Sequence, residues 1–126
     1  MTTSAHATGQ RERGAAAEAL AARYLERQRL RIVGRNYRCR GGEIDLIAED
    51  AGTTVFVEVR QRSSARFGGA AQSIDARKRA RIVLAAQHYL ASSGRPDRRC
   101  RFDVVLLADP GGSDLEWIRS AFDASP

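Results

Sequence analysis

The stretch Gly41–Arg62, GGEIDLIAEDAGTTVFVEVRQR, constrains the fold more than any other part of this sequence. Its first half, GEIDLIAE, has the alternating pattern of a strand. Its second half, TTVFVEVRQR, is rich in β-branched and aromatic residues, which also favours a strand. The residues DAGT between the halves are typical of a tight turn. We therefore predict an antiparallel hairpin with its turn centred on Ala51 and Gly52.

This hairpin predicts that two carboxylates converge. With the turn at that place, the numbers of paired residues sum to 103, so Asp45 lies opposite Glu58 and Glu43 lies opposite Arg60. Directly opposed side chains have β-carbons about 4.5–5.5 Å apart, and like charges so placed destabilise a sheet. Asp45 and Glu58 therefore need a proton, a basic partner or a divalent cation; Mg²⁺ is typically held by one or two carboxylates. The alternative is a pair of solvated carboxylates near a sheet end, balanced by arginines.

The flanking sequence completes an α/β pattern in the order α-β-β-β-α-β-β, which predicts a mixed sheet flanked by helices. The length of 126 residues suits a single domain, which we place at residues 10–122. Residues 1–9 are expected to be a disordered lead-in and residues 123–126 a tail. Outside the hairpin, we predict helices over about Gln10–Arg29 and Ile74–Ser93, and strands over Leu30–Arg38, residues 98–109 and residues 115–122.

Each predicted helix places one charged side chain where a helix normally faces the core. Glu18 borders the apolar stripe of the first helix, so it either reaches a site on the sheet or is an ordinary boundary residue. Lys78 falls in the middle of the apolar stripe of the second helix. A lysine there is costly to bury without a partner. Either its ammonium extends into solvent while its stem packs, or it points at carboxylates on the sheet.

The charge of the chain favours a polyanionic partner. The net charge is +6, the isoelectric point is about 10.3, and Lys78 is the only lysine among 21 basic residues. Arginine binds phosphate with a bidentate fork. Tyr37 is a candidate stacking group near the basic residues of the first strand. The candidate nucleic-acid contacts are Arg35, Arg38, Arg40, Arg62, Arg66 and Arg77. The alternative is a basic surface that serves solubility alone.

Several classes of protein are disfavoured. No apolar run approaches the roughly 20 residues that a membrane span needs, so we expect no membrane partner. The N-terminus lacks the apolar segment of a secretory signal, which predicts a cytoplasmic protein. The two cysteines and two histidines are not spaced as zinc ligands, and we find no phosphate-binding glycine loop.

Four motifs identify a family resemblance. GGEIDLIAED, VFVEVRQR, FGGAAQSIDARKRARI and RFDVV closely resemble the YraN family of small bacterial proteins. That family in turn resembles the PD-(D/E)xK nucleases, which have the restriction-endonuclease-like fold, and particularly the archaeal Holliday junction resolvases. The resemblance covers roughly Glu12–Phe122. It implies hydrolysis of DNA, in branched or repair intermediates, with Mg²⁺ or Mn²⁺. It is also compatible with a homodimer.

Residue by residue, the resemblance places the metal-binding aspartate of the superfamily on Asp45 and the acidic member of its (D/E)xK element on Glu58. Glu18 matches the glutamate that resolvase-like members bring from the first helix, so the implied metal ligands are these three residues. Arg60 occupies the lysine position, which is a departure from the pattern. A guanidinium stays protonated and is no general base, although it can stabilise charge on a phosphate. Lys78 is the candidate to supply an amine instead.

Two other functions stay open from the sequence. The first alternative to a nuclease is a nucleic-acid-binding module that keeps the same fold but has lost cleavage, and that recognises DNA by shape and phosphate contacts. The second alternative is a protein-interaction domain.

Overall fold

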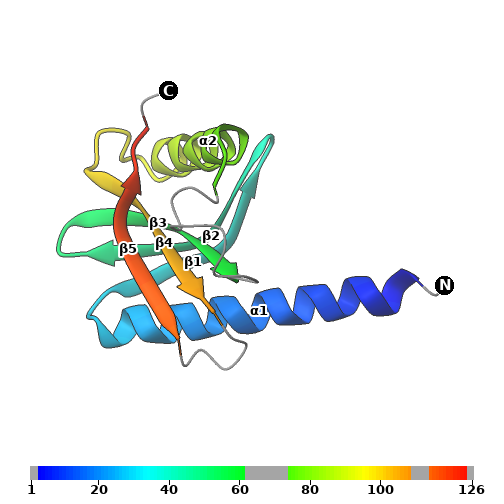
Figure 1. Cartoon of the computed structure of the whole chain (residues 1–126). Coiled ribbons are helices and arrows are strands. Elements are labelled where there is room, and N and C mark those ends of the chain that lie inside the picture. Colours follow the sequence, from blue (N-terminus) through cyan, green and yellow to red (C-terminus); the bar gives the residue numbers. More distant parts are fainter. Residues whose placement is uncertain (1–2, 62–73, 109–113, 125–126) are drawn as a thin grey trace.

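Two helices lie on opposite sides of an open, five-stranded mixed sheet (Figure 1). The computed structural model describes residues 3–61, 74–108 and 114–124, with side chains from Gly14 onward. In chain order the elements are α1 (Thr3–Arg27), β1 (Arg31–Cys39), β2 (Gly42–Asp50), β3 (Thr53–Gln61), α2 (Ala76–Ser92), β4 (Cys100–Leu107) and β5 (Leu115–Phe122). The strands are adjacent in sequence order, and only β3 and β4 are parallel. The predicted α/β architecture of a mixed sheet flanked by helices is confirmed.

The largest difference from the predicted helix ends is at the start of α1. Helix α1 begins at Thr3 rather than near Gln10, so residues 3–9 lie within the helix. Alanines are frequent there and proline is absent, which permits the helix to extend. At the start of α2, the side chain of Asp75 accepts a hydrogen bond from the backbone N–H of Lys78 at 2.8 Å. Neither helix, over the stretch that is described, is long and apolar enough to cross a membrane.

The predicted register of the central hairpin is confirmed. Ala51 and Gly52 have φ angles of 49° and 92°, and two consecutive positive φ angles are the mark of the tight type I′ hairpin turn. The paired residues run from Asp50 with Thr53 to Leu46 with Val57, and their numbers sum to 103 as expected.

The two strands of this hairpin separate beyond Leu46 and Val57. β2 continues to Gly42 paired with β1, and β3 continues to Gln61 paired with β4. We call the space between these diverging ends, residues 42–45 of β2 and 58–61 of β3, the fork. The separation of the strands is visible at the right of Figure 1.

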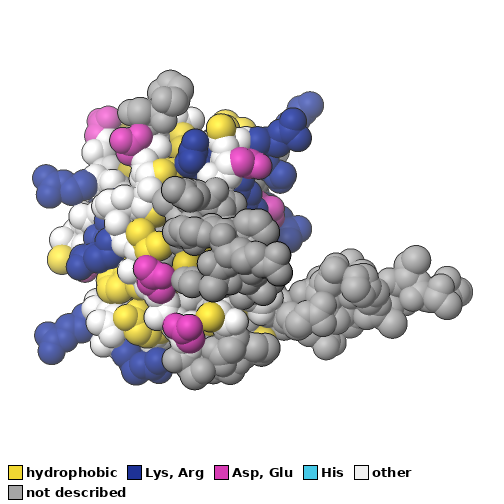
Figure 2. Space-filling view, viewed as in Figure 1, with side chains coloured by type: hydrophobic (Ala, Val, Ile, Leu, Met, Phe, Trp, Pro, Cys, Tyr) yellow, Lys and Arg dark blue, Asp and Glu magenta, His cyan; other side chains and the backbone are white. Residues whose placement is uncertain are grey.

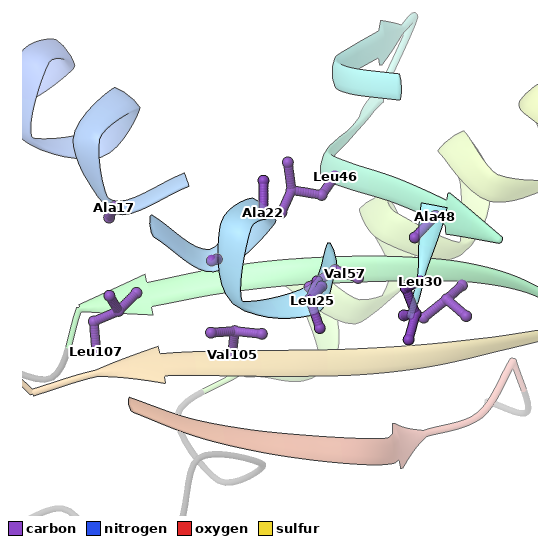
Figure 3. Packing of buried hydrophobic residues seen from close by; sticks show 11 residues of the cluster. Ala17, Ala22, Leu25, Leu30, Leu46, Ala48, Val57, Val105 and Leu107 are labelled. Atoms are coloured by element: carbon purple, nitrogen blue, oxygen red, sulfur yellow. The ribbon is translucent and has the colours of Figure 1, made fainter. Parts of the chain in front are cut away.

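Helices α1 and α2 cover the two faces of the sheet, and each positions side chains beside the fork. The α1 face buries Ala17, Ala21, Ala22 and Leu25 against Leu46, Ala48, Val57 and Val105 (Figure 3). The α2 face buries Ile82, Ala85, Ala86 and Leu90 against Ile44, Ile47, Phe56 and Phe102. This packing fixes Glu18 on α1 and Lys78 on α2 relative to the sheet between them.

Gly42 determines how closely α2 approaches the fork. A β-carbon at this position would lie 2.4 Å from the carbonyl oxygen of Arg81 and 3.0 Å from the backbone nitrogen of Ala85. We expect Gly42→Ala to destabilise the fold by about 1–3 kcal/mol, because backbone atoms of α2 have to move. Urea unfolding measures this change. Gly14→Ala is the control: an added β-carbon there meets no atom within 4 Å, and the change should stabilise α1 by up to about 1 kcal/mol. Equal stability of Gly42→Ala and the unmodified chain would contradict the argument.

Candidate functional site

Asp45 lies on β2 at the point where the fork opens. One of its carboxylate oxygens, Oδ2, accepts a hydrogen bond from the backbone N–H of Val59 at 2.8 Å. The bond joins the two strands just beyond the last pair of the β2–β3 ladder. The side chain of Asp45 thus takes over where backbone pairing stops, and its carboxylate is held in a fixed orientation.

Glu58 faces Asp45 from β3, and its side chain is only 4% exposed. Burial, the charge of Asp45 and a hydrogen bond with Asp45 together raise the pKa of Glu58 from 4.5 to about 8, although Lys78 acts in the opposite direction. At neutral pH the Glu58 carboxyl therefore keeps its proton and is hydrogen-bonded to Asp45. The two carboxyl groups predicted to converge do so in the structure.

Two cationic side chains reach the same oxygen of Glu58. The ammonium of Lys78, on α2, lies 3.4 Å from Glu58 Oε2, and the guanidinium of Arg60, on β3, lies 3.7 Å from it. The sequence allowed two directions for Lys78, and in the structure its side chain points at the carboxylates on the sheet. Lys78 remains 29% exposed, so its charge is partly solvated.

Glu43 lies at the outer edge of the fork and was predicted to face Arg60. That prediction is wrong, because the β2–β3 ladder ends before this position and Glu43 instead pairs with Arg38 of β1. Its carboxylate lies 3.8 Å from both Lys78 Nζ and Arg81 Nη2, and 3.7 Å from Arg38 Nε. Glu43 and Glu58 therefore hold the ammonium of Lys78 between them.

Glu18 adds an acidic side chain from the α1 side, in contact with Asp45. Burial raises the pKa of Glu18, and the charge of Asp45 raises it further. Glu18 is hydrogen-bonded to Asp45 and to Asn36, a contact that the sequence reasoning missed. Asn36 has a φ of 51°, a conformation that asparagine tolerates better than most residues. An asparagine inside a predicted strand was therefore the sequence feature that could have drawn attention to this position.

The acidic pair fits a divalent cation better than the full predicted ligand set does. Across the described stretches, no three or more His, Cys, Asp or Glu side chains are arranged to hold a metal ion. Asp45 and Glu58 nevertheless face each other, the proton on Glu58 can be replaced by a cation, and two carboxylates suffice for Mg²⁺ when phosphate and water supply the other ligands. Glu18 contacts Asp45 without completing a third position in this arrangement.

One candidate arginine, Arg38, forms an ion pair with Glu43 at the outer edge of the fork. Four of the candidate arginines, Arg35, Arg38, Arg40 and Arg77, are exposed, whereas Arg62 and Arg66 lie outside the described residues. On the face seen in Figure 2, basic side chains project at several separate points around the outline. Tyr37 is no exposed stacking group, because its ring packs edge-on against Tyr89 of α2 at 5.3 Å and its hydroxyl is hydrogen-bonded to His88.

Comparison with known proteins finds similarity across the whole site. A family model described as "Uncharacterised protein family UPF0102" matches residues 17–107, which include Glu18, the fork and Lys78. A UPF0102 protein of Dechloromonas aromatica (strain RCB) is 62% identical over 112 residues, 89% of each chain. A UPF0102 protein of Nitrosomonas europaea is 53% identical over 113 residues, 90% of this chain and 95% of its own. A third, of Pseudomonas entomophila (strain L48), is 52% identical over 113 residues, 87% of this chain and 92% of its own.

Proposed function

We propose that this chain, which belongs to the uncharacterised protein family UPF0102, hydrolyses DNA phosphodiester bonds with the help of Mg²⁺ or Mn²⁺. UPF0102 is the YraN family, so the family resemblance drawn from the motifs is confirmed. The main support for the activity is the meeting of Asp45 and Glu58 beside two cationic side chains. Such a site offers acidic ligands for a cation and positive charge for a phosphate.

Asp45 and Glu58 are the residues that would hold the cation. When bound, a divalent cation polarises a phosphate and lowers the pKa of an attacking water. The N–H of Val59 orients the Asp45 carboxylate for this role. Glu58 has to release its proton first, so the affinity of the site for metal should rise with pH.

Lys78 and Arg60 supply positive charge where the phosphate would lie. Arg60 stays protonated, so its role is to stabilise the negative charge that develops in the transition state. Lys78 brings the amine that the superfamily pattern has at the position of Arg60. Glu43 positions Lys78, because its carboxylate lies 3.8 Å from the ammonium.

The proposal is tested by incubating the purified protein with labelled DNA in Mg²⁺, Mn²⁺ or EDTA. The substrates are a four-way junction, a flap, a linear duplex and a single strand. We expect cleavage of at least one branched substrate, and only with metal. Asp45→Asn keeps the size of the side chain and should reduce the rate by about 10³-fold. Asp97→Asn, at an exposed position after α2, is the matched control and should cleave normally. Failure to cut any of these DNAs with either metal would overturn the proposal.

A second candidate is a module that binds nucleic acid without cutting it. Two observations favour it: Arg60 replaces the usual lysine, and three carboxylates do not form a complete ligand set over the described part of the chain. Such a module would bind DNA equally well in EDTA and after Asp45→Asn. Its affinity should fall with salt, with log K decreasing by about 0.9 per phosphate contact for each unit of log salt. A protein-interaction domain would show no such salt-dependent affinity for DNA.

A further inference from the structure

A hollow lies at the other end of the sheet from the fork. This cavity has a volume of about 240 Å³. It is lined by the start of β1, by the ends of β2 and β3 beside their turn, and by the C-terminal end of α2. Thr54 in its wall is four residues from Glu58, which corresponds to roughly 13 Å along β3. Leu90 and Ser93 line it at the end of α2, whereas Lys78 lies in the first turn of that helix. The cavity is therefore separate from the proposed active site.

One wall of the cavity is a closed hydrogen-bonded network. The Nε of Arg98 donates to Thr54 Oγ1 at 2.8 Å, and Thr54 Oγ1 donates to Glu49 Oε2 at 2.8 Å. The Nη2 of Arg98 forms an ion pair with the other oxygen of Glu49. These three side chains satisfy one another's hydrogen-bonding groups, and the ion pair with Arg98 engages Glu49, which is also the cross-strand partner of Arg31.

Two further arginines, Arg31 and Arg95, line the same cavity from exposed positions. Among the residues that the structure describes, neither guanidinium has a hydrogen-bond or ion-pair partner. The cavity lining holds three arginines, Arg31, Arg95 and Arg98, against one carboxylate, that of Glu49, which leaves a net charge of +2. The carbonyl groups at the C-terminus of α2 do little to offset this charge, since Leu90 O accepts from Arg95 N at 2.9 Å and Tyr89 O accepts from Ser93 N at 2.9 Å.

Apolar surface adjoins these charges. Val33 is 38% exposed, one of two large hydrophobic side chains so exposed over the described ranges. Leu90 and Tyr89 lie beside it in the cavity lining. A ligand that fits this lining combines a compact anionic group with an apolar or planar part.

We infer that this cavity binds the terminal phosphate of a nucleotide, with the sugar or base against Val33 and Leu90. A phosphate monoester carries about −1.5 to −2 charges at pH 7, which matches the net charge of +2 in the lining, whereas a diester carries one. The volume is slightly below the roughly 300–1,000 Å³ of pockets for whole small molecules, which suits a single nucleotide unit. Either a free mononucleotide or the phosphorylated end of a strand supplies this chemistry.

The test measures binding in EDTA, without any cleavage. The probes are one short single-stranded oligonucleotide with a 5′-phosphate, the same strand with a 5′-hydroxyl, and free dAMP, each against the full chain. We expect the 5′-phosphate to improve affinity about tenfold or more. The double variant Arg31→Gln/Arg95→Gln should lose this preference. Arg23→Gln/Arg27→Gln, which removes the same charge from exposed positions on α1 across the sheet, should keep it.

The outcomes separate the two sources and test the site. Competition by dAMP as strong as that by the phosphorylated strand identifies a free nucleotide as the ligand; competition by the strand alone identifies a strand end. Amide NMR signals of Thr54 and Arg95 should shift on binding while that of Val59 stays in place. Equal affinity for the two strands, or equal loss in the two double variants, would overturn the inference. Because the assay contains no metal, its result is independent of whether the fork cleaves DNA.

Discussion

Replacing Glu58 by glutamine is expected to make the protein more stable at pH 8, although the change removes a proposed metal ligand. The pKa of Glu58 is raised from 4.5 to about 8 in the folded protein. Because the folded pKa is the higher one, Glu58 contributes stability that is fully present below about pH 4.5 and is lost as the pH rises through about 8. The loss approaches about 1.4 kcal/mol per pH unit, or roughly 2–3 kcal/mol between pH 6 and pH 8. Glutamine has no such proton to lose.

Urea unfolding of both proteins at pH 6 and pH 8 measures this effect. From pH 6 to pH 8, the unfolding free energy of Glu58→Gln should rise relative to that of the unmodified chain by about 2 kcal/mol. Glu26→Gln, at an exposed position on α1, controls for the loss of one carboxylate. Mg²⁺ at pH 8 should stabilise the unmodified chain and not Glu58→Gln, since binding to the native state alone adds stability. A difference that stays constant from pH 6 to pH 8 would contradict the assigned proton.

The register of the central hairpin was predictable because local chemistry determines it. A two-residue turn at Ala51 and Gly52 permits one pairing of the strands, and a slip by one residue would turn every side chain to the other face. For Lys78 the sequence narrowed the direction to two possibilities, since a lone lysine in an apolar helical stripe needs either solvent or an acidic partner, and the structure has the second. Both inferences depend only on spacing within one element and on the cost of burying charge.

The end of the β2–β3 ladder was not predictable from the same patterns. The ladder stops where the side chain of Asp45 accepts a hydrogen bond from the N–H of Val59, a contact that no propensity describes. The partner of Glu43 changed as a consequence, from Arg60 to Arg38. Tyr37 was misjudged for a related reason: whether an aromatic ring on a strand faces solvent or a helix depends on how the helix packs, not on its neighbours in sequence.

Replacing Lys78 by methionine is expected to reduce metal-dependent cleavage by about 100-fold or more. Methionine keeps most of the packed stem and removes the ammonium that lies 3.4 Å from Glu58. Two losses then combine. The phosphate loses a nearby positive charge, and Glu58 loses the contact that lowers its pKa, so the proton on Glu58 competes more strongly with a cation at neutral pH.

Two companion variants separate charge from amine. Lys78→Arg keeps the positive charge and should retain most of the electrostatic part of the rate. Arg60→Lys in the Lys78→Met background returns an amine beside the same atom, because Arg60 and Lys78 approach Glu58 Oε2 at 3.7 Å and 3.4 Å. Recovery by Arg60→Lys and not by Lys78→Arg would assign proton transfer to the amine; the reverse would assign charge alone. Cleavage at an unchanged rate in Lys78→Met, with DNA affinity in EDTA also unchanged, would exclude Lys78 from the reaction.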